Sequence, residues 1–289
     1  MPNDWRLAYP GEDLAFGSIA SRLVFTSAPD LGSHEIRHDD AGRPRADGVV
    51  FGADFFGGRT ITFDVAVAGE DEAEARGLLA RMARAWRADV VRRTPGAVAT
   101  LVSDSGRVVF GRPRRFASTD ELLPEGMSQV IADFATADSV WYGPTEHSVS
   151  VALQPAPGGG LLAPLASPLA TTSSSDRSTV FTVEGDVDTW PVFEIQGPIT
   201  NPVVEIVDRL RMEFRTTLAF DETLVVDTRP WGRSILRNGA SLAGSLSRSS
   251  TRLSQAALPP GRHELVLRGL SEAGTARVNA RWRDAYLTP

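Results

Sequence analysis

The sequence predicts a mainly β protein built from two domains. Most of the chain alternates apolar and polar residues with the period of two that is typical of half-buried strands, as in 60–67 and 192–195. One long segment, 71–93, follows the helical period instead. A segment rich in Pro, Gly and Ser, 154–178, separates a strand–helix–strand region from a region that contains strand patterns alone.

The composition is that of a soluble globular protein. The chain has 289 residues, of which 42% are hydrophobic and 23% charged, so it is long enough for two ordinary domains. No apolar run approaches the roughly 18 residues that span a bilayer, so we expect no membrane insertion. The first residues lack the basic start and apolar core of a secretory signal, and none is expected. The absence of cysteine excludes disulfides and thiolate metal sites.

The charge balance argues against nucleic-acid binding. The formal net charge is −6, and the arginines are scattered apart from a short cluster at 112–115. Proteins that bind nucleic acid concentrate positive charge, because it replaces the counterions on the phosphates. We therefore expect no specific contact with nucleic acid.

The helical segment, about residues 71–93, carries a signal at each end. Asp71 and Glu74 form the pattern of a capping box, and Thr94-Pro95-Gly96 ends the periodicity. One apolar face recurs every three or four residues, and its members are Leu78, Leu79, Met82, Trp86 and Val90. We expect this face to cover a sheet, and we interpret its Trp and Met residues as core rather than as a ligand pocket.

The N-terminal domain, residues 1–148, is therefore predicted to be a β-sandwich or barrel with one packed helix. Within it, residues 103–106 resemble a hairpin loop between two apolar runs. The second domain, 149–289, is predicted to be a two-sheet sandwich, with the unpatterned stretch 154–178 as a linker or long loop. The strand patterns in this domain include 202–207, 222–226 and 263–267, and Asn238-Gly239 is a strong turn signal.

Residues 34–38 read HEIRH, which matches the H-E-x-x-H pattern of zinc proteases. In those enzymes one helix brings two histidines to the metal and places the glutamate beside the metal-bound water. Here the segment lies between Gly32 and Gly42, too short and too polar for a stable helix. We predict that His34 and His38 are exposed loop residues and that no metal binds.

No active site is predicted elsewhere, so the chain is expected to be neither an enzyme nor a cofactor protein. The run 239–244 only approximates the G-x-S-x-G nucleophile turn and lacks the strand and helix that should flank it. Asp186 and Asp188 could serve as paired carboxylates in glycoside hydrolysis. Paired acids in turns more often bond their own backbone, and we prefer that interpretation.

The second half carries residues that resemble a signature of the siphovirus distal tail protein family, the phage minor tail proteins that cap the tail tube. The specific part is GDVDTWPVFEIQGPITNPVVEI at 185–206, and matching runs follow at 224–228, 234–239, 258–267 and 278–287. The first half resembles the family more loosely, because Asp138-Ser139-Val140 replaces the Asp-Pro that many relatives have before the Trp-Tyr pair. The matching residues are Gly185, Asp186, Trp190, Pro191, Gly197, Pro198, Asn201, Pro202, Asp227, Gly239, Pro260 and Gly261.

These residues are expected to have structural rather than catalytic roles. Trp190-Pro191 should open a strand, where a proline costs no interior ladder bond. Gly197-Pro198 and Asn201-Pro202 should form turns on both sides of the two residues between them.

The resemblance implies a structural virion protein at the phage tail tip, made in the cytoplasm of a bacterial host. The N-terminal domain would form a homohexameric ring that joins the tail tube to the tail-tip or baseplate machinery and lets DNA pass. The second domain would be a galectin-like β-sandwich. The implied partners are the tail tube protein, the tail-tip hub and the tape measure protein.

A carbohydrate-binding adhesin is the alternative function, acting through the galectin-like domain on a host-surface glycan. Sugar sites often stack the ring on an aromatic side chain beside polar groups. Trp231 is the candidate sugar contact, although a buried turn tryptophan is the simpler interpretation.

Overall fold

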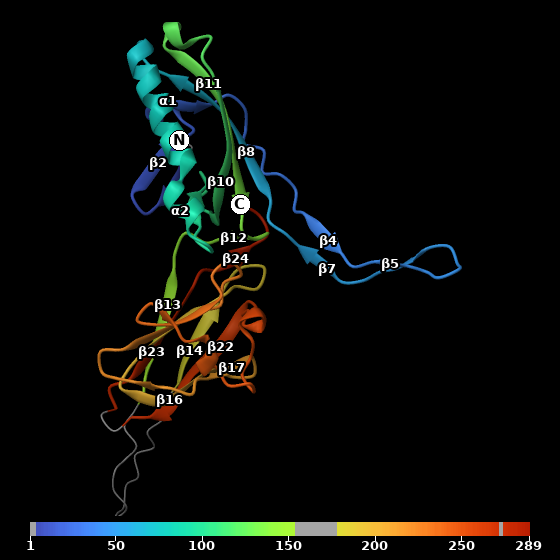
Figure 1. The fold of residues 1–289 in the computed structure, drawn as a ribbon, viewed down its shortest axis with the longest axis vertical. Helices are drawn as coiled ribbons and strands as arrows, with labels where there is room; N and C mark the ends of the chain where they lie inside the picture. Colours follow the sequence, from blue (N-terminus) through green and yellow to red (C-terminus); the bar gives the residue numbers. More distant parts are fainter. Residues whose placement is uncertain (1–3, 154–177, 272–273) are drawn as a thin grey trace, which may run out of the picture. The chain divides into compact units, whose positions relative to one another are not determined.

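The computed structural model describes residues 4–153, 178–271 and 274–289, and it divides into two compact units. Unit 1 comprises Met1–Pro144 and Tyr286–Pro289, and unit 2 comprises Thr145–Ala285 (Figure 1). The boundary expected after residue 148 falls inside strand β13 (His147–Ala152), which pairs within unit 2. Of the unpatterned stretch 154–178, only Ser178 lies within the described residues.

Unit 1 is built on one antiparallel sheet with strand order β2-β1-β9-β10-β11-β8-β3. The sheet curls until its two edges meet, because Gly17 after β2 bridges Val24 in β3 and its amide donates to the Leu23 carbonyl at 2.6 Å. The result is a nearly closed barrel. Apart from its α-helices and arm, this unit contains strands and the 3-10 helices η1 and η2. These elements are β1 Trp5–Tyr9, β2 Glu12–Phe16, η1 Ile19–Ser21, β3 Leu23–Phe25, β8 Thr60–Ala68, β9 Ala99–Val102, β10 Val108–Thr119, η2 Leu123–Glu125, β11 Met127–Thr136 and β12 Trp141–Tyr142.

Helix α1 (Glu72–Arg87) packs on this sheet and begins as the sequence predicts. The Asp71 carboxylate accepts from the Glu74 amide, and Glu74 in turn accepts from the Glu70 amide. Trp86 is fully buried, and its ring meets Phe16 and Phe63 edge to face. Phe63 lies on the inner face of β8, where every second residue is buried. The helix therefore covers the core, as expected.

The expected helix 71–93 is interrupted at Ala88. This residue adopts a left-handed conformation (φ 45°), and a second short helix, α2 (Asp89–Arg93), follows it. The predicted apolar face consequently ends early. Val90 is 57% exposed, whereas Val91 is buried. The prediction for Val90 was wrong because the break at Ala88 rotates the next turn.

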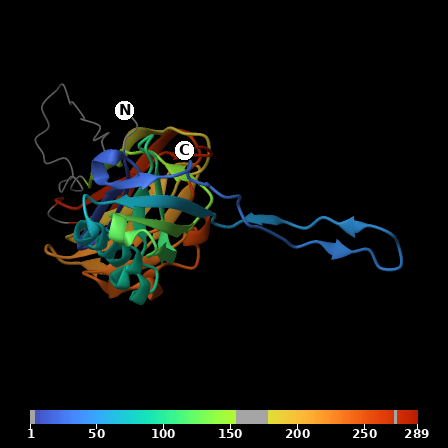
Figure 2. The same ribbon diagram turned by 90° about the horizontal axis from the view of Figure 1, so that it is seen from above.

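Between β3 and β8 the chain leaves the barrel as a two-stranded arm (Figures 1 and 2). Strand β4 (Ile36–His38) pairs with β7 (Asp54–Phe56), and further out β5 (Ala41–Gly42) pairs with β6 (Val49–Val50). We refer to residues 35–56 as the arm. A loop was expected over the first part of this segment, whereas the structure has paired strands there.

Unit 2 is a sandwich of two antiparallel sheets. One sheet has the order β13-β23-β15-β19-β20-β21, and the other has the order β14-β22-β16-β17 with β18 beside β16. A single apolar core drawn from both sheets lies between them and includes Phe193, Ile206 and Leu267. The remaining elements are β14 Ser178–Val183, β15 Val192–Gln196, β16 Ile199–Ile206, β17 Leu210–Glu213, β18 Thr217–Leu218, β19 Thr223–Asp227, β20 Ser234–Arg237, β21 Ala240–Ser241, η3 Ala243–Ser245, η4 Leu253–Gln255, β22 Gly261–Leu270 and β23 Arg277–Trp282. The last strand, β24 Ala285–Tyr286, spans the boundary between the two units.

Two predicted turns are confirmed and one is wrong. Residues 103–106 connect β9 to β10, and Asn238-Gly239 connects β20 to β21 with positive φ at both positions, as a two-residue hairpin requires. Asn201-Pro202 does not form a turn. It lies within β16 as a bulge, and Asn201 takes the left-handed conformation there.

Candidate functional site

The arm is the most exposed part of the described chain. Every residue from 35 to 56 is exposed, although the segment contains six large apolar side chains. Phe51 is 83% exposed, Phe56 64% and Phe55 54%. Clustered apolar surface of this kind on a soluble protein typically marks a site of interaction with another molecule.

Both faces of the arm carry apolar side chains. Ile36 lies opposite Phe56 on one face, and Arg37 lies opposite Phe55 on the other, with its guanidinium carbon 6.0 Å from the Phe55 ring centre. An isolated two-stranded hairpin is at best marginally stable in water. A partner that contacts the arm on both faces would bury this surface and stabilise the hairpin.

The two strands that enter the arm pass very close to the barrel. A Cβ added at Gly32 would lie 2.2 Å from the Thr60 carbonyl oxygen, and one at Gly58 would lie 2.1 Å from that of Thr136. Only glycine permits this approach, so the glycines fix where the arm departs.

Arg59 joins the root of the arm to the barrel. Its side chain is buried, donates to the Ser139 carbonyl at 2.7 Å and contacts the His34 ring nitrogen Nε2 at 2.9 Å. Its guanidinium carbon also lies 5.6 Å from the Trp141 ring centre. One arginine thus connects the first arm strand, the second arm strand and the segment before β12.

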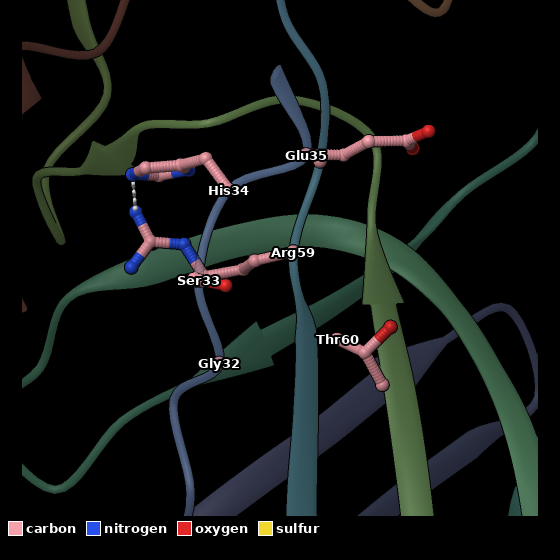
Figure 3. A pocket seen from close by; sticks show the side chains of 7 residues that line it. Gly32, Ser33, His34, Glu35, Arg59 and Thr60 are labelled. Atoms are coloured by element: carbon pink, nitrogen blue, oxygen red, sulfur yellow. Dashed lines mark hydrogen bonds between the residues drawn. The ribbon is translucent and has the colours of Figure 1, made fainter. Parts of the chain in front are cut away.

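A pocket of about 390 Å³ lies at this root, lined by residues 32–35 and 58–60. In Figure 3 the side chains of His34 and Arg59 point toward each other, whereas Glu35 points away. Burial, and secondarily the charge of Arg59, lowers the pKa of His34. The lowered pKa favours the neutral imidazole, which can accept the arginine hydrogen bond.

Asp138 is the buried acid of the same region. Burial raises the pKa of its carboxyl to about 6, against the opposing effects of the Tyr142 hydroxyl, the Val140 backbone and Arg59. The Tyr142 hydroxyl donates to Oδ2 of Asp138 at 2.6 Å.

The HEIRH motif lies on the first arm strand, not on a helix. His38 is exposed and pairs with Asp40 at 3.5 Å. His34 is half-buried against Arg59, so the expectation that it is an exposed loop residue was wrong. Because residues 36–38 form a strand, the geometry that zinc-protease chemistry requires is not present at this motif.

The signature residues of unit 2 occupy positions that constrain the backbone. Gly185 (φ 101°) bridges Ala285, and Asp186 donates its amide to the Ala285 carbonyl. Gly197 and Pro198 are joined by a cis peptide bond, and a Cβ at Gly197 would lie 2.0 Å from the Ala219 carbonyl oxygen. Pro260 is exposed before Gly261, which opens β22. These residues are distributed over the sandwich rather than gathered at one site.

Trp190, Pro191 and Asp227 do come together. The Thr228 hydroxyl donates to the Pro191 carbonyl at 2.6 Å, and Asp227 forms a two-pronged ion pair with Arg229. The guanidinium carbon of Arg233 lies 5.8 Å from the Trp190 ring centre. The signature therefore marks a structural corner.

The same corner contains Trp231, the candidate sugar contact. Trp231 is half-buried, and the guanidinium carbon of Arg229 lies 5.7 Å from its ring centre. An arginine over the ring occupies a face on which a sugar would stack. The sugar contact at Trp231 stays a prediction.

Sequence reasoning missed the arm as a functional element. The available signal was a group of apolar residues, at 49–51 and 55–56, set among turn-forming glycines at 42, 48, 52, 57 and 58. These residues show no extended alternation of apolar and polar positions, because the arm does not pack on the core. Hydrophobic periodicity therefore did not indicate strands here.

No family model and no curated protein sequence matches the chain. Among solved structures, the chain resembles the Dit protein (gp 19.1) of phage SPP1, which is described as a paradigm of the hub of the adsorption apparatus in phages that infect Gram-positive bacteria. The TM-score is 0.58 at 15% identity, over 98% of this chain and 99% of the Dit chain.

This chain has the distal tail protein fold. Two further similar chains come from the phage P2 baseplate in its activated conformation. With calcium the TM-score is 0.57 at 15% identity, covering 97% of this chain and 98% of the other. With strontium it is 0.56 at 14% identity, covering 96% and 97%. The distal tail fold therefore extends over both units, as the sequence resemblance implied.

No helix in the described ranges has both the length and the hydropathy required to cross a bilayer.

Proposed function

We propose that this protein is a structural hub at the tip of a phage tail. Six copies form a ring through unit 1, and the ring joins the tail tube to the tail-tip or baseplate proteins. The tape measure protein and the outgoing DNA pass through its bore. The protein acts in the virion, after synthesis in the bacterial host cytoplasm.

The distal tail fold supports the hub role, and the arm supports the ring. Residues 35–56 expose three phenylalanines on a segment that leaves the barrel. In a ring, each arm has one neighbouring copy to contact. The arm is one surface and its receiving site on the next copy is another. A contact between two different surfaces closes into a ring when the rotation between copies is right.

The test removes the apolar surface of the arm and leaves its backbone in place. Phe51→Ser, Phe55→Ser and Phe56→Ser are combined in the full chain, and the mass is measured by native mass spectrometry. We expect the unchanged protein to form hexamers and the triple variant to be mainly monomeric. Circular dichroism should be unaltered, because none of the three side chains is buried.

A matched control removes exposed apolar surface from unit 2. Phe220 and Leu270 are 78% and 72% exposed, and changing both to serine should leave the hexamer intact. If the arm variant still assembles like the unchanged protein, the arm does not carry the ring. If the unchanged protein is monomeric at high concentration, the hub proposal itself fails.

A further inference from the structure

The two ends of unit 1 carry opposite charge. The N-terminal end of α1 lies beside the β10–β11 connection, where the Gly69 amide donates to the Gly126 carbonyl at 2.8 Å (Figure 1). We call this the acidic end, and its charged residues are Glu70, Asp71, Glu72, Glu74, Asp120, Glu121 and Glu125, with Arg22 and Arg76. At the other end of α1, about 24 Å away by the rise of a 16-residue helix, α2 packs on β10.

We call the second region the basic end, and its charged residues are Arg84, Arg87, Arg92, Arg93, Arg112, Arg114 and Arg115, with Asp89 and Glu12. Arg92 donates to the backbone carbonyls of Pro113 and Arg114, each at 2.8 Å. Arg112 likewise donates to the Thr94 carbonyl at 2.8 Å. Backbone carbonyls carry no net charge, so these contacts do not neutralise either arginine.

The charge at each end exceeds what the protein itself neutralises. At the acidic end Arg22 pairs with Glu70 and Glu74, and Arg76 pairs with Glu72. Three carboxylates on the β10–β11 connection, Asp120, Glu121 and Glu125, form no ion pair among the described residues. At the basic end, Asp89 pairs with Arg87 and Arg93, and no ion pair within the described ranges reaches Arg114 or Arg115.

Exposed apolar side chains accompany the charges at both ends. Leu122 and Met127 are exposed within the acidic end, and Val90 is exposed within the basic end. Apolar residues bordered by polar and charged ones are the usual composition of a protein–protein interface. Both ends therefore have the character of contact surfaces, and their charges are complementary.

We propose that the basic end of one copy docks on the acidic end of the next copy, as a second contact in the ring beside the arm. This inference rests on the proposed ring. The partner is a second copy of this chain because one unit presents both complementary surfaces. Like charges would meet if two copies approached by the same end, so the contact also fixes the direction in which copies follow one another.

The test reverses the charge at one end at a time in the full chain. One variant carries Asp120→Arg and Glu121→Arg, and the other carries Arg114→Glu and Arg115→Glu. In the proposed contact residues 114–115 of one copy face residues 120–121 of the next, so each variant alone brings like charges together at these positions. We expect half-assembly to require at least about tenfold more protein. All four residues are exposed, so folding should be retained.

An equal mixture of the two variants gives the decisive measurement. In a ring of alternating variants, residues 114–115 again face residues of opposite charge at 120–121 in every contact, so the mixture should form hexamers with three copies of each. Native mass spectrometry of isotope-labelled and unlabelled variants reads this composition directly. Asp221→Arg with Arg248→Glu, which lie on the surface of unit 2, form the matched control and should leave assembly unchanged.

Three results overturn the inference. If each reversal variant assembles like the unchanged protein, the end-to-end contact is wrong while the ring stands. If both variants are monomeric and their mixture stays monomeric, the two ends do not meet each other. If the unchanged protein never assembles, the proposed function falls and this inference with it. Should a reversal variant misfold, the neutral pairs Asp120→Asn with Glu121→Gln and Arg114→Gln with Arg115→Gln replace it, with weakened assembly at low salt as the expected result.

Discussion

At the scale of single residues, Asp138 is the group whose ionisation opposes folding. Its carboxyl pKa is raised by burial from 3.8 to about 6. The protonated form is favoured in the folded state, so the stability that it contributes is fully present below pH 4. That stability is lost as the pH rises through about 6.

Asp138→Asn should therefore stabilise the protein at neutral pH. The amide keeps an oxygen that can accept from Tyr142 but carries no charge to bury. We expect the free energy of unfolding at pH 8 to rise by about 1–3 kcal/mol, with little change at pH 4. Urea unfolding at both values measures it. A variant that is less stable at pH 8 would show that the ionised carboxylate is needed by Arg59.

Sequence alone indicated that position 138 was unusual, but not why. Asp138-Ser139-Val140 departs from the family pattern. The structure adds that the carboxyl is enclosed and that Ser139 supplies the carbonyl for Arg59. Burial of a polar side chain depends on residues far away in the chain, here on the strand that leaves the arm. The local sequence pattern around residue 138 therefore cannot predict that its carboxyl is buried.

At the scale of elements, the contact of α1 with the barrel depends on Trp86. The ring is fully buried, and its Nε1 donates to the Asp133 carbonyl at 3.0 Å. Trp86→Ala should cost about 3–5 kcal/mol, because it leaves a cavity among Phe16 and Phe63.

Trp86→Phe is the matched control, since it retains most of the ring and loses the hydrogen bond. It should cost distinctly less than the alanine variant in the same denaturant titration. A loss below about 1 kcal/mol for Trp86→Ala would contradict the packing described here.

The elements that bury one face could be predicted from sequence. Strands β8, β15 and β19 follow the alternation at 60–67, 192–195 and 222–226, and α1 follows its apolar face. The break at Ala88 could not be predicted, because alanine favours helix and its left-handed conformation here runs against that preference. The bulge at Asn201 resembled a turn because both need the same backbone conformation.

At the scale of the whole molecule, unit 1 is made from both ends of the chain. Tyr286 belongs to it, and the guanidinium carbon of Arg107 lies 3.2 Å from the Tyr286 ring centre. Tyr286→Ala should destabilise unit 1 by about 1 kcal/mol and leave unit 2 unaffected.

Hydrogen exchange read separately in β10 and β19 tests this prediction. Exchange in β10 should become faster, and exchange in β19 should not change. Tyr286→Phe keeps the ring beneath Arg107 and should behave nearly like the unchanged protein. Equal acceleration in both strands would mean that the two units unfold together.

Because unit 1 contains residues from both ends of the chain, its parts are translated at different times. About 140 residues of unit 2 are translated between Pro144 and Tyr286. At the usual 5–20 residues per second, the ribosome needs roughly 7–30 s to produce them. During that interval the first strands of the barrel and the arm are already outside the exit tunnel, while the Arg107–Tyr286 contact is still missing. A nascent chain therefore exposes its arm before the unit that bears it is complete.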